Sequence, residues 1–176
     1  DPSAAQSLRA LEDDVDATID EVRSLARGIY PPLLARTGLR QALSAAARTA
    51  AVPTTVSADG LGRYPAEVET TVYFSCSEAL QNAAKHAGAD THVMISVWQD
   101  RDLHFEVSDD GSGFDVDATP PGTGLQNLKD RLAAVGGTFT IRSVRGRGTV
   151  LGGSIPLPAQ WRVQPERSAA PPGPPV

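Results

Sequence analysis

The chain has 176 residues, a formal net charge of −5 and a hydrophobic fraction of 40%. This length accommodates one domain plus appendages, because domains most often contain about 100 to 150 residues. The negative charge argues against direct nucleic-acid binding, which requires positive charge to neutralise phosphates. No apolar run reaches the ~18 to 20 residues that a membrane-spanning helix needs, and no signal-peptide pattern opens the chain. Cys76 is the only cysteine, so no intramolecular disulfide can form, and we expect a soluble, cytoplasmic protein.

Residues 5–30 are predicted to form one helix with a narrow apolar stripe. The stripe consists of Leu8, Leu11, Val15, Thr18, Val22, Leu25 and Ile29, which alternate spacings of three and four residues. Such spacing is typical of a coiled-coil seam, since it keeps one narrow face turned toward a partner helix. Pro31 and Pro32 are expected to end this helix. The alternative is an amphipathic helix packed on its own domain.

The remaining pattern predicts a layered α+β fold. Helices are predicted over residues 39–51, 65–87 and 125–135. Strands are predicted over residues 54–57, 91–98, 103–108, 138–144 and 149–155, with the second and third forming a hairpin. Hairpins without strict strand–helix alternation favour a two-layer sandwich of helices on a sheet. From Pro156 on, the chain contains too few apolar residues to pack and is expected to be disordered.

Three polar residues on the predicted helix 65–87 indicate a metal–phosphate site. Glu78, Asn82 and Lys85 fall at i, i+4 and i+7, so they project from one face. A carboxylate, an amide oxygen and an ammonium at this spacing suit a hydrated Mg²⁺ ion that carries phosphates, because Mg²⁺ takes few protein ligands. The alternative is an ordinary solvated helix face.

Asp109 follows an apolar strand and opens the loop 109–113, which contains Gly111 and Gly113. A carboxylate at a strand end can accept a hydrogen bond from the exocyclic amine of adenine, whereas guanine presents an acceptor at that ring position. Glycines let the backbone approach a purine closely. The alternatives are an ordinary Asp-Gly turn and a calcium loop, but the glutamate that a calcium loop of the EF-hand type needs is missing.

Gly122, Thr123 and Gly124 precede the helix predicted from Leu125. The free N–H groups and the positive end of the helix dipole are therefore placed to receive phosphate oxygens. The segment is neither a Walker loop nor a Rossmann fingerprint, since it lacks their residues and spacing. Lys85, His86 and Arg131 are candidates to add positive charge, and a structural role for His86 is an equal alternative.

Taken in order, four motifs resemble a known family. Residues 77–87, 109–113, 122–125 and 146–149 resemble the N box and the three glycine boxes of the GHKL ATP-binding fold. The run from Asn82 to Ala87, the eight residues between Gly113 and Gly122, and residues 122–137 look like the catalytic domain of two-component sensor histidine kinases. The subfamily resembled is the nitrate-sensor and lipid-desaturase-sensor type, which has a short ATP lid.

This resemblance implies a fold and a division of the chain. The fold implied is the Bergerat-type two-layer α/β sandwich, a mixed sheet covered by helices on one face, preceded by a partial dimerisation helix. Residues 1–32 would be the end of the dimerisation and phosphotransfer region, and residues 33–158 the ATP-binding catalytic domain. Residues 159–176 would be a disordered tail rich in proline and alanine.

The resemblance also implies roles for individual residues. Asn82 would coordinate Mg²⁺, with Glu78 as the N-box glutamate, and Glu78, Asn82 and Lys85 would form the catalytic set. Asp109 would hold adenine. The other implied nucleotide-binding residues are Lys85, His86, Gly111, Gly113, Gly122, Thr123, Gly124, Leu125, Gly148 and Thr149.

The function implied is transfer of the γ-phosphate of ATP to a histidine and its later transfer to a response regulator. In this subfamily the acceptor histidine is followed by Asp or Glu, and none of His86, His92 and His104 is. We therefore expect the catalytic part of a longer kinase, monomeric or weakly dimeric, acting on a separate dimerisation and phosphoacceptor domain. The alternatives are an anti-sigma-type serine kinase and a non-catalytic dimeric module that binds nucleotide.

Overall fold

The structure, a computed structural model, describes residues 31–161 except 89, 117 and 119–122. The predicted coiled-coil helix at 5–30 and most of the predicted tail lie outside the described residues. In the described part of the chain, none of the helices combines the length and the apolar character needed to cross a membrane.

Helices and strands follow one another closely along the chain. The helices are α2 (Pro32–Thr37), α3 (Leu39–Arg48), α4 (Ala66–His86), α5 (Thr123–Ala134) and a short 3₁₀ helix (Ala159–Trp161). The strands are β1 (Thr54–Ser57), β2 (Val93–Gln99), β3 (Asp102–Asp109), β4 (Thr138–Ser143) and β5 (Thr149–Pro156).

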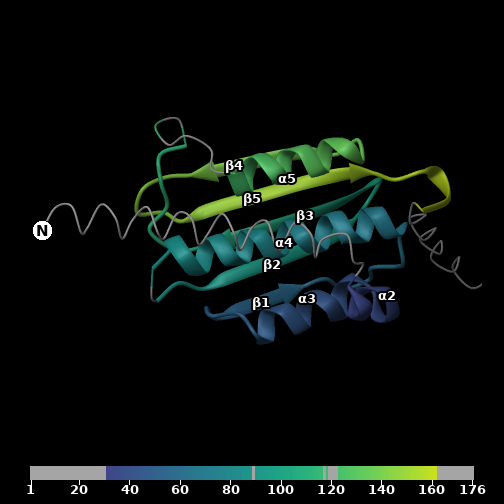
Figure 1. Cartoon of the computed structure of the whole chain (residues 1–176), viewed down its shortest axis with the longest axis horizontal. Coiled ribbons are helices and arrows are strands. Elements are labelled where there is room, and N and C mark those ends of the chain that lie inside the picture. The colour runs from purple at the N-terminus through teal and green to yellow at the C-terminus, as the bar shows by residue number, and fades with distance from the viewer. Residues whose placement is uncertain (1–30, 89, 117, 119–122, 162–176) are drawn as a thin grey trace, which may run out of the picture.

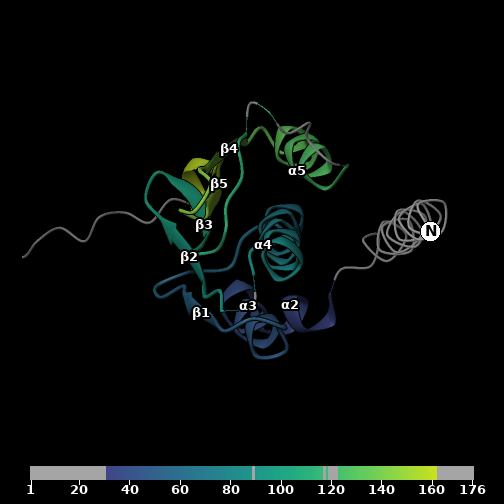
Figure 2. The same cartoon turned by 90° about the vertical axis from the view of Figure 1, so that its left-hand side faces the viewer.

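The strands form one mixed sheet in the order β1-β2-β3-β5-β4 (Figure 1). β1 pairs with β2 in parallel, and the other neighbours pair antiparallel. Figure 2 shows the helices together on one side of this sheet. The predicted α+β fold of two layers is therefore confirmed, as is the hairpin of β2 and β3.

The core lies between the inner face of the sheet and α4. Along β2 and β3 every second residue is buried, including Val93, Ile95 and Phe105, because successive side chains of a strand point to opposite faces. α4 contributes Val72 and Cys76, both fully buried. Burial raises the pKa of the Cys76 thiol, so this cysteine is a core residue, as its apolar surroundings in the sequence indicate.

Several elements differ from the prediction. α3 ends at Arg48 instead of residue 51, and β2 begins at Val93 instead of residue 91. One short helix was not predicted: α2 begins at Pro32, where the missing N–H of proline is tolerated in the first turn. α5 begins at Thr123, two residues earlier than expected. The chain also continues to pack beyond Pro156: Leu157 is 1% exposed, and the side-chain amide of Gln99 donates a hydrogen bond to the carbonyl of Trp161. The expectation of disorder from Pro156 on is therefore wrong for residues 156–161, because the Leu157 side chain packs in the core.

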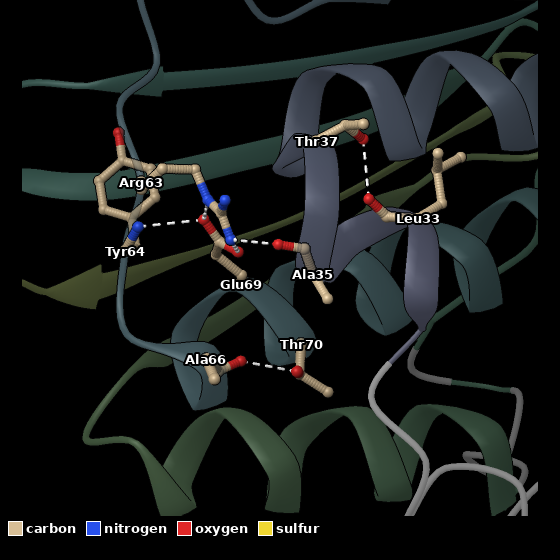
Figure 3. A network of polar contacts seen from close by, with 8 residues as sticks. All are labelled: Leu33, Ala35, Thr37, Arg63, Tyr64, Ala66, Glu69 and Thr70. Atoms are coloured by element: carbon tan, nitrogen blue, oxygen red, sulfur yellow. Dashed lines mark hydrogen bonds and ion pairs between the residues drawn. The ribbon is translucent and has the colours of Figure 1, made fainter.

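A buried carboxylate ties the start of α4 to its surroundings (Figure 3). Glu69 is fully buried, and its Oε1 accepts hydrogen bonds from Nε of Arg63 at 2.8 Å and from the backbone N–H of Tyr64 at 3.0 Å. Nη2 of Arg63 lies 3.1 Å from Oε2 of Glu69 and also donates to the carbonyl of Ala35 in α2 at 3.0 Å. This network therefore holds α2, the loop before α4 and the first turns of α4 together.

Replacing Arg63 with methionine is expected to lower the free energy of unfolding by about 2 kcal/mol. A buried carboxylate that loses its charged partner costs ~3 to 5 kcal/mol, and half exposure of the Arg63 side chain reduces that figure. Arg40→Met is the matched control, because Arg40 pairs at 3.1 Å with the exposed Asp59 and should cost less than ~1 kcal/mol. Urea unfolding of both variants measures the difference, and equal losses would contradict a structural role for the Arg63–Glu69 pair.

Candidate functional site

A pocket of about 400 Å³ lies between the inner face of the sheet and the helices α4 and α5. Its lining includes residues of β3, β4 and β5, the second half of α4, the loop after β3 and the first turn of α5. The lining residues are Ala79, Asn82, Ala83, His86, Ala87, Val107, Asp109, Ser112, Gly113, Phe114, Gly124, Leu125, Ile141, Thr149 and Leu151.

Apolar side chains form the facing walls of this pocket. Val107, Ile141 and Leu151 project from neighbouring strands, while Ala79 and Ala83 lie opposite on α4. The small alanine side chains leave a gap between helix and sheet that larger residues would fill. Such a slot suits a flat, apolar ring with a polar edge.

Asp109 stands at one end of the slot, as the last residue of β3 and the register partner of Thr149 on β5. Its Oδ1 accepts hydrogen bonds from the backbone N–H groups of Gly111 at 3.0 Å and Thr149 at 3.3 Å. Within the described residues, no protein donor reaches Oδ2 of Asp109. This oxygen is therefore an acceptor that the pocket can offer to a ligand.

The loop after Asp109 is fixed on both sides. The N–H and hydroxyl of Ser112 donate to the carbonyls of Ala87 at 2.8 Å and His86 at 3.0 Å, at the end of α4. The N–H of Gly146, in the turn between β4 and β5, donates to the carbonyl of Ser112 at 2.6 Å. The loop that carries Gly111 and Gly113 is thus held between α4 and a hairpin turn.

Two glycines of the predicted motifs are required by close backbone contacts. Gly148 has a φ of +72°, and a Cβ there would collide with the carbonyl oxygen of Asp109. Gly113 has a φ of +55°, and its Cβ would collide with the carbonyl oxygen of Val144. These contacts bring the loop after β3 and the β4–β5 turn against each other without side chains between them.

The predicted polar face of α4 contributes unequally to the pocket. Asn82 and His86 line it, whereas the exposed Lys85 does not. Glu78 lines a neighbouring groove with Tyr73 and Phe74. It still borders the site, because a Cβ on Gly124 would lie 2.5 Å from its Oε1. The structure therefore brings Asn82, His86 and Asp109 together, with Glu78 at the margin.

The first turn of α5 forms another part of the lining. Gly124 and Leu125 contact the pocket, and the N–H groups of a first helical turn have no acceptor within the helix. This end of α5 can therefore receive anionic groups. Gly122 and the side chain of Thr123, also predicted for this role, lie outside the described structure.

Ser143 was not identified from the sequence, although it organises the polar end of the pocket. Its Oγ lies within hydrogen-bond distance of the N–H of Phe114 at 2.8 Å, the carbonyl of Gly148 at 3.0 Å and Oγ1 of Thr149 at 3.0 Å. No sequence motif contains Ser143, which gains its place only through the pairing of β4 with β5, where it lies opposite Thr149. Val107, Ile141 and Leu151, which form the apolar wall, also belong to no motif. Their only signal in the sequence was the alternation of apolar and polar residues along the strands.

The described residues contain no group of three or more His, Cys, Asp and Glu side chains that could hold a metal ion. A site built mainly by protein ligands, such as a structural zinc centre, is therefore absent from the described part of the chain. Asn82 in the pocket and the nearby Glu78 can still supply one or two oxygen ligands. That donor set fits Mg²⁺, which retains water and substrate phosphates for the rest of its coordination.

The fold and the pocket define a class of protein. It is a two-layer α+β sandwich with a slot between its central helix and one end of a mixed sheet. A carboxylate acceptor, Asp109, lies at one end of the slot, and the N-terminus of α5 forms part of its lining. Residues 67–159 match the model of the histidine kinase-, DNA gyrase B- and HSP90-like ATPase family, and the chain belongs to this family.

Individual relatives are sensor histidine kinases. YdfH of Bacillus subtilis is 38% identical over 99 residues, which cover 53% of this chain and 24% of YdfH. MctS of Rhizobium johnstonii is 31% identical, with 95% of this chain and 40% of MctS covered. The chain thus spans less than half the length of these curated relatives.

Solved structures agree with this grouping. The histidine kinase domain of the blue-light activated histidine kinase from Erythrobacter litoralis EL346 superposes with a TM-score of 0.55 at 25% identity. The match covers 69% of this chain and 58% of that domain.

Gly148→Ala is expected to destabilise the protein more than Gly146→Ala. Both residues have a positive φ, so alanine costs each about 1 to 2 kcal/mol. Only at Gly148 does the new Cβ meet another atom, the Asp109 carbonyl, whereas nothing lies within 4 Å at Gly146. The extra collision should add ~1 to 3 kcal/mol in urea unfolding. Equal losses in the two variants would show that the Asp109–Gly148 contact is not tight.

Proposed function

We propose that this chain is the ATP-binding catalytic domain of a sensor histidine kinase. Family membership and the relatives support the class of activity. The observation that carries the proposal for this chain is the position of Asp109 at the end of an apolar slot, with Oδ1 fixed by two backbone donors and Oδ2 directed to no described protein donor.

In this proposal adenine occupies the slot between the sheet and α4. The ring faces lie against Val107, Ile141 and Leu151 on one side and the alanines of α4 on the other. Oδ2 of Asp109 accepts a hydrogen bond from the 6-amino group. A 6-oxo group would place two acceptors against each other, so the same site disfavours guanine.

The phosphates extend from the slot toward Asn82 and the first turn of α5. Asn82 supplies an oxygen ligand to Mg²⁺, and the free N–H groups around Gly124 and Leu125 bind phosphate oxygens. When bound, Mg²⁺ neutralises charge that develops on the transferring phosphoryl group. Glu78, beside Gly124, orients groups at this end, and Lys85 and His86 add positive charge.

We further propose the short-lid subfamily of sensor kinases, with the lid formed by the eight residues between Gly113 and Gly122. The acceptor is a histidine of a dimerisation and phosphoacceptor domain, from which a response regulator takes the phosphoryl group. None of the three histidines of this chain is followed by Asp or Glu, which supports an acceptor on a separate domain. The domain acts in the cytoplasm.

Asp109→Asn is expected to weaken binding of ADP and ATP by at least about tenfold, measured by isothermal titration calorimetry. The amide replaces an acceptor with a donor facing the 6-amino group, and a lost hydrogen bond to a charged group is worth roughly 1.5 to 3 kcal/mol. Asp110→Asn is the matched control, because the exposed Asp110 carboxylate accepts, among the described donors, only from the N–H of His92 at 2.7 Å. Unchanged affinity in Asp109→Asn would refute the adenine site.

Phosphoryl transfer is tested with γ-labelled ATP and a helical domain that carries a His-Asp or His-Glu pair from a sensor kinase of this family. We expect label on that domain only when this chain, Mg²⁺ and ATP are all present. The label should be lost in acid and retained in base, as phosphohistidine is. Acid-stable label would identify a serine kinase instead, and ATP binding without any transfer would favour a non-catalytic module.

A further inference from the structure

The Ser143 hydroxyl stands where three parts of the site meet. It lies at the end of β4, on the same face of that strand as the pocket residue Ile141. Its Oγ contacts the N–H of Phe114, the carbonyl of Gly148 and the hydroxyl of Thr149, at 2.8, 3.0 and 3.0 Å. Phe114 and Thr149 both line the pocket.

Counting protons fixes the direction of each bond. A serine hydroxyl has one proton to donate and two lone pairs to accept with. The carbonyl of Gly148 can only accept, so it takes the Ser143 proton. The N–H of Phe114 can only donate, so it occupies one lone pair of the Ser143 oxygen. The contact with Thr149 is then a hydrogen bond only if Thr149 donates its proton to Ser143.

This assignment determines what Thr149 can offer a ligand. With its proton given to Ser143, Oγ1 of Thr149 presents lone pairs alone to the pocket. The carboxylate of Asp109, held next to Thr149 by the bond from the Thr149 N–H, offers acceptor oxygens as well. Of the described side chains, Asp109 and Thr149 therefore offer two acceptors at the polar end of the slot, and neither offers a hydroxyl proton to a ligand.

We propose that Ser143 is a specificity-determining residue, which selects 6-aminopurine over 6-oxopurine nucleotides by holding the Thr149 hydroxyl proton away from the ligand. This inference rests on the proposed adenine site. Ser143 acts through Thr149, so it is a positioning residue. Without Ser143 the Thr149 hydroxyl turns and donates, directly or through a water molecule, to a 6-oxo group.

The test compares affinities for ADP and inosine diphosphate, which differ at the 6-position and at the proton on N1, by calorimetry at saturating Mg²⁺. Wild type should prefer ADP strongly, and Ser143→Ala should lower the ADP-to-IDP preference on the order of tenfold. Ser154→Ala is the matched control, because Ser154 shares a bond with Thr138 at 2.9 Å in the same strand pair but on the exposed side. Its preference should equal that of wild type.

A double-mutant comparison separates specificity from simple structural damage. Thr149→Val removes the acceptor and should itself lower the ADP-to-IDP preference. Ser143→Ala made in the Thr149→Val background should then change nothing further, because no hydroxyl remains to turn. Thr149→Val, which keeps side-chain shape, also tests the acceptor if Ser143→Ala fails to fold.

Several results would overturn the proposal. These are an unchanged preference in Ser143→Ala, an equal change in Ser154→Ala, and a full Ser143→Ala effect in the Thr149→Val background. If wild type bound neither nucleotide, the adenine site itself would be refuted and this inference with it. If wild type preferred ADP and Ser143→Ala kept that preference, the adenine site would stand while the role of Ser143 would fall. Equal binding of both nucleotides by wild type would contradict the Asp109 contact as well.

Discussion

The register between β3 and β5 sets Asp109 directly against Thr149, and the geometry of the pocket depends on this pairing. It lets one carboxylate oxygen accept from Gly111 and Thr149 at once. A shift of one residue would turn every side chain of β5 to the opposite face and remove the second donor. Gly148, next to the pair, lets the backbones approach closely enough for that register to hold.

Packing of α4 fixes the wall of the pocket that faces the sheet. The helix is anchored at its start by the buried Glu69 and its Arg63 partner, and at its end by the bonds from Ser112 to the carbonyls of His86 and Ala87. Its buried face carries alanines where the slot is needed and larger side chains elsewhere. The same helix thus stabilises the core and places Asn82, so its stability and the shape of the site are linked.

The sequence predicted features whose chemistry is local. Asp109 and the glycines that follow it were recognisable as a candidate purine site, because a carboxylate at the end of a strand followed by glycines is a pattern that can be read from neighbouring residues. The helical spacing placed Glu78, Asn82 and Lys85 on one face, but the pocket lies beside that face. Its lining on α4 consists of Ala79, Asn82, Ala83, His86 and Ala87. At about 100° of rotation per residue, Asn82 lies at the edge of this lining stripe, whereas Lys85 is turned further from it and is exposed.

Features that depend on pairing between distant segments were not predictable in the same way. Ser143 gains its role from the strand opposite and from Phe114, which is 29 positions away in the sequence. Leu157 packs although its neighbours are proline-rich, because burial depends on the space that the fold leaves. α2 begins at Pro32 because proline, which lacks a backbone N–H, is favourable in the first turn of a helix.

The most direct test of the adenine site is to map amide chemical shifts while Mg²⁺ and ADP are added. The account predicts the largest changes at the N–H groups of Gly111, Gly113 and Thr149 and at the side-chain amide of Asn82. Trp98, whose exposed side chain lies across the sheet from the pocket, should change little. Changes confined to Trp98 and its neighbours, or to the groove of Tyr73 and Phe74, would contradict the assignment of the nucleotide to this pocket.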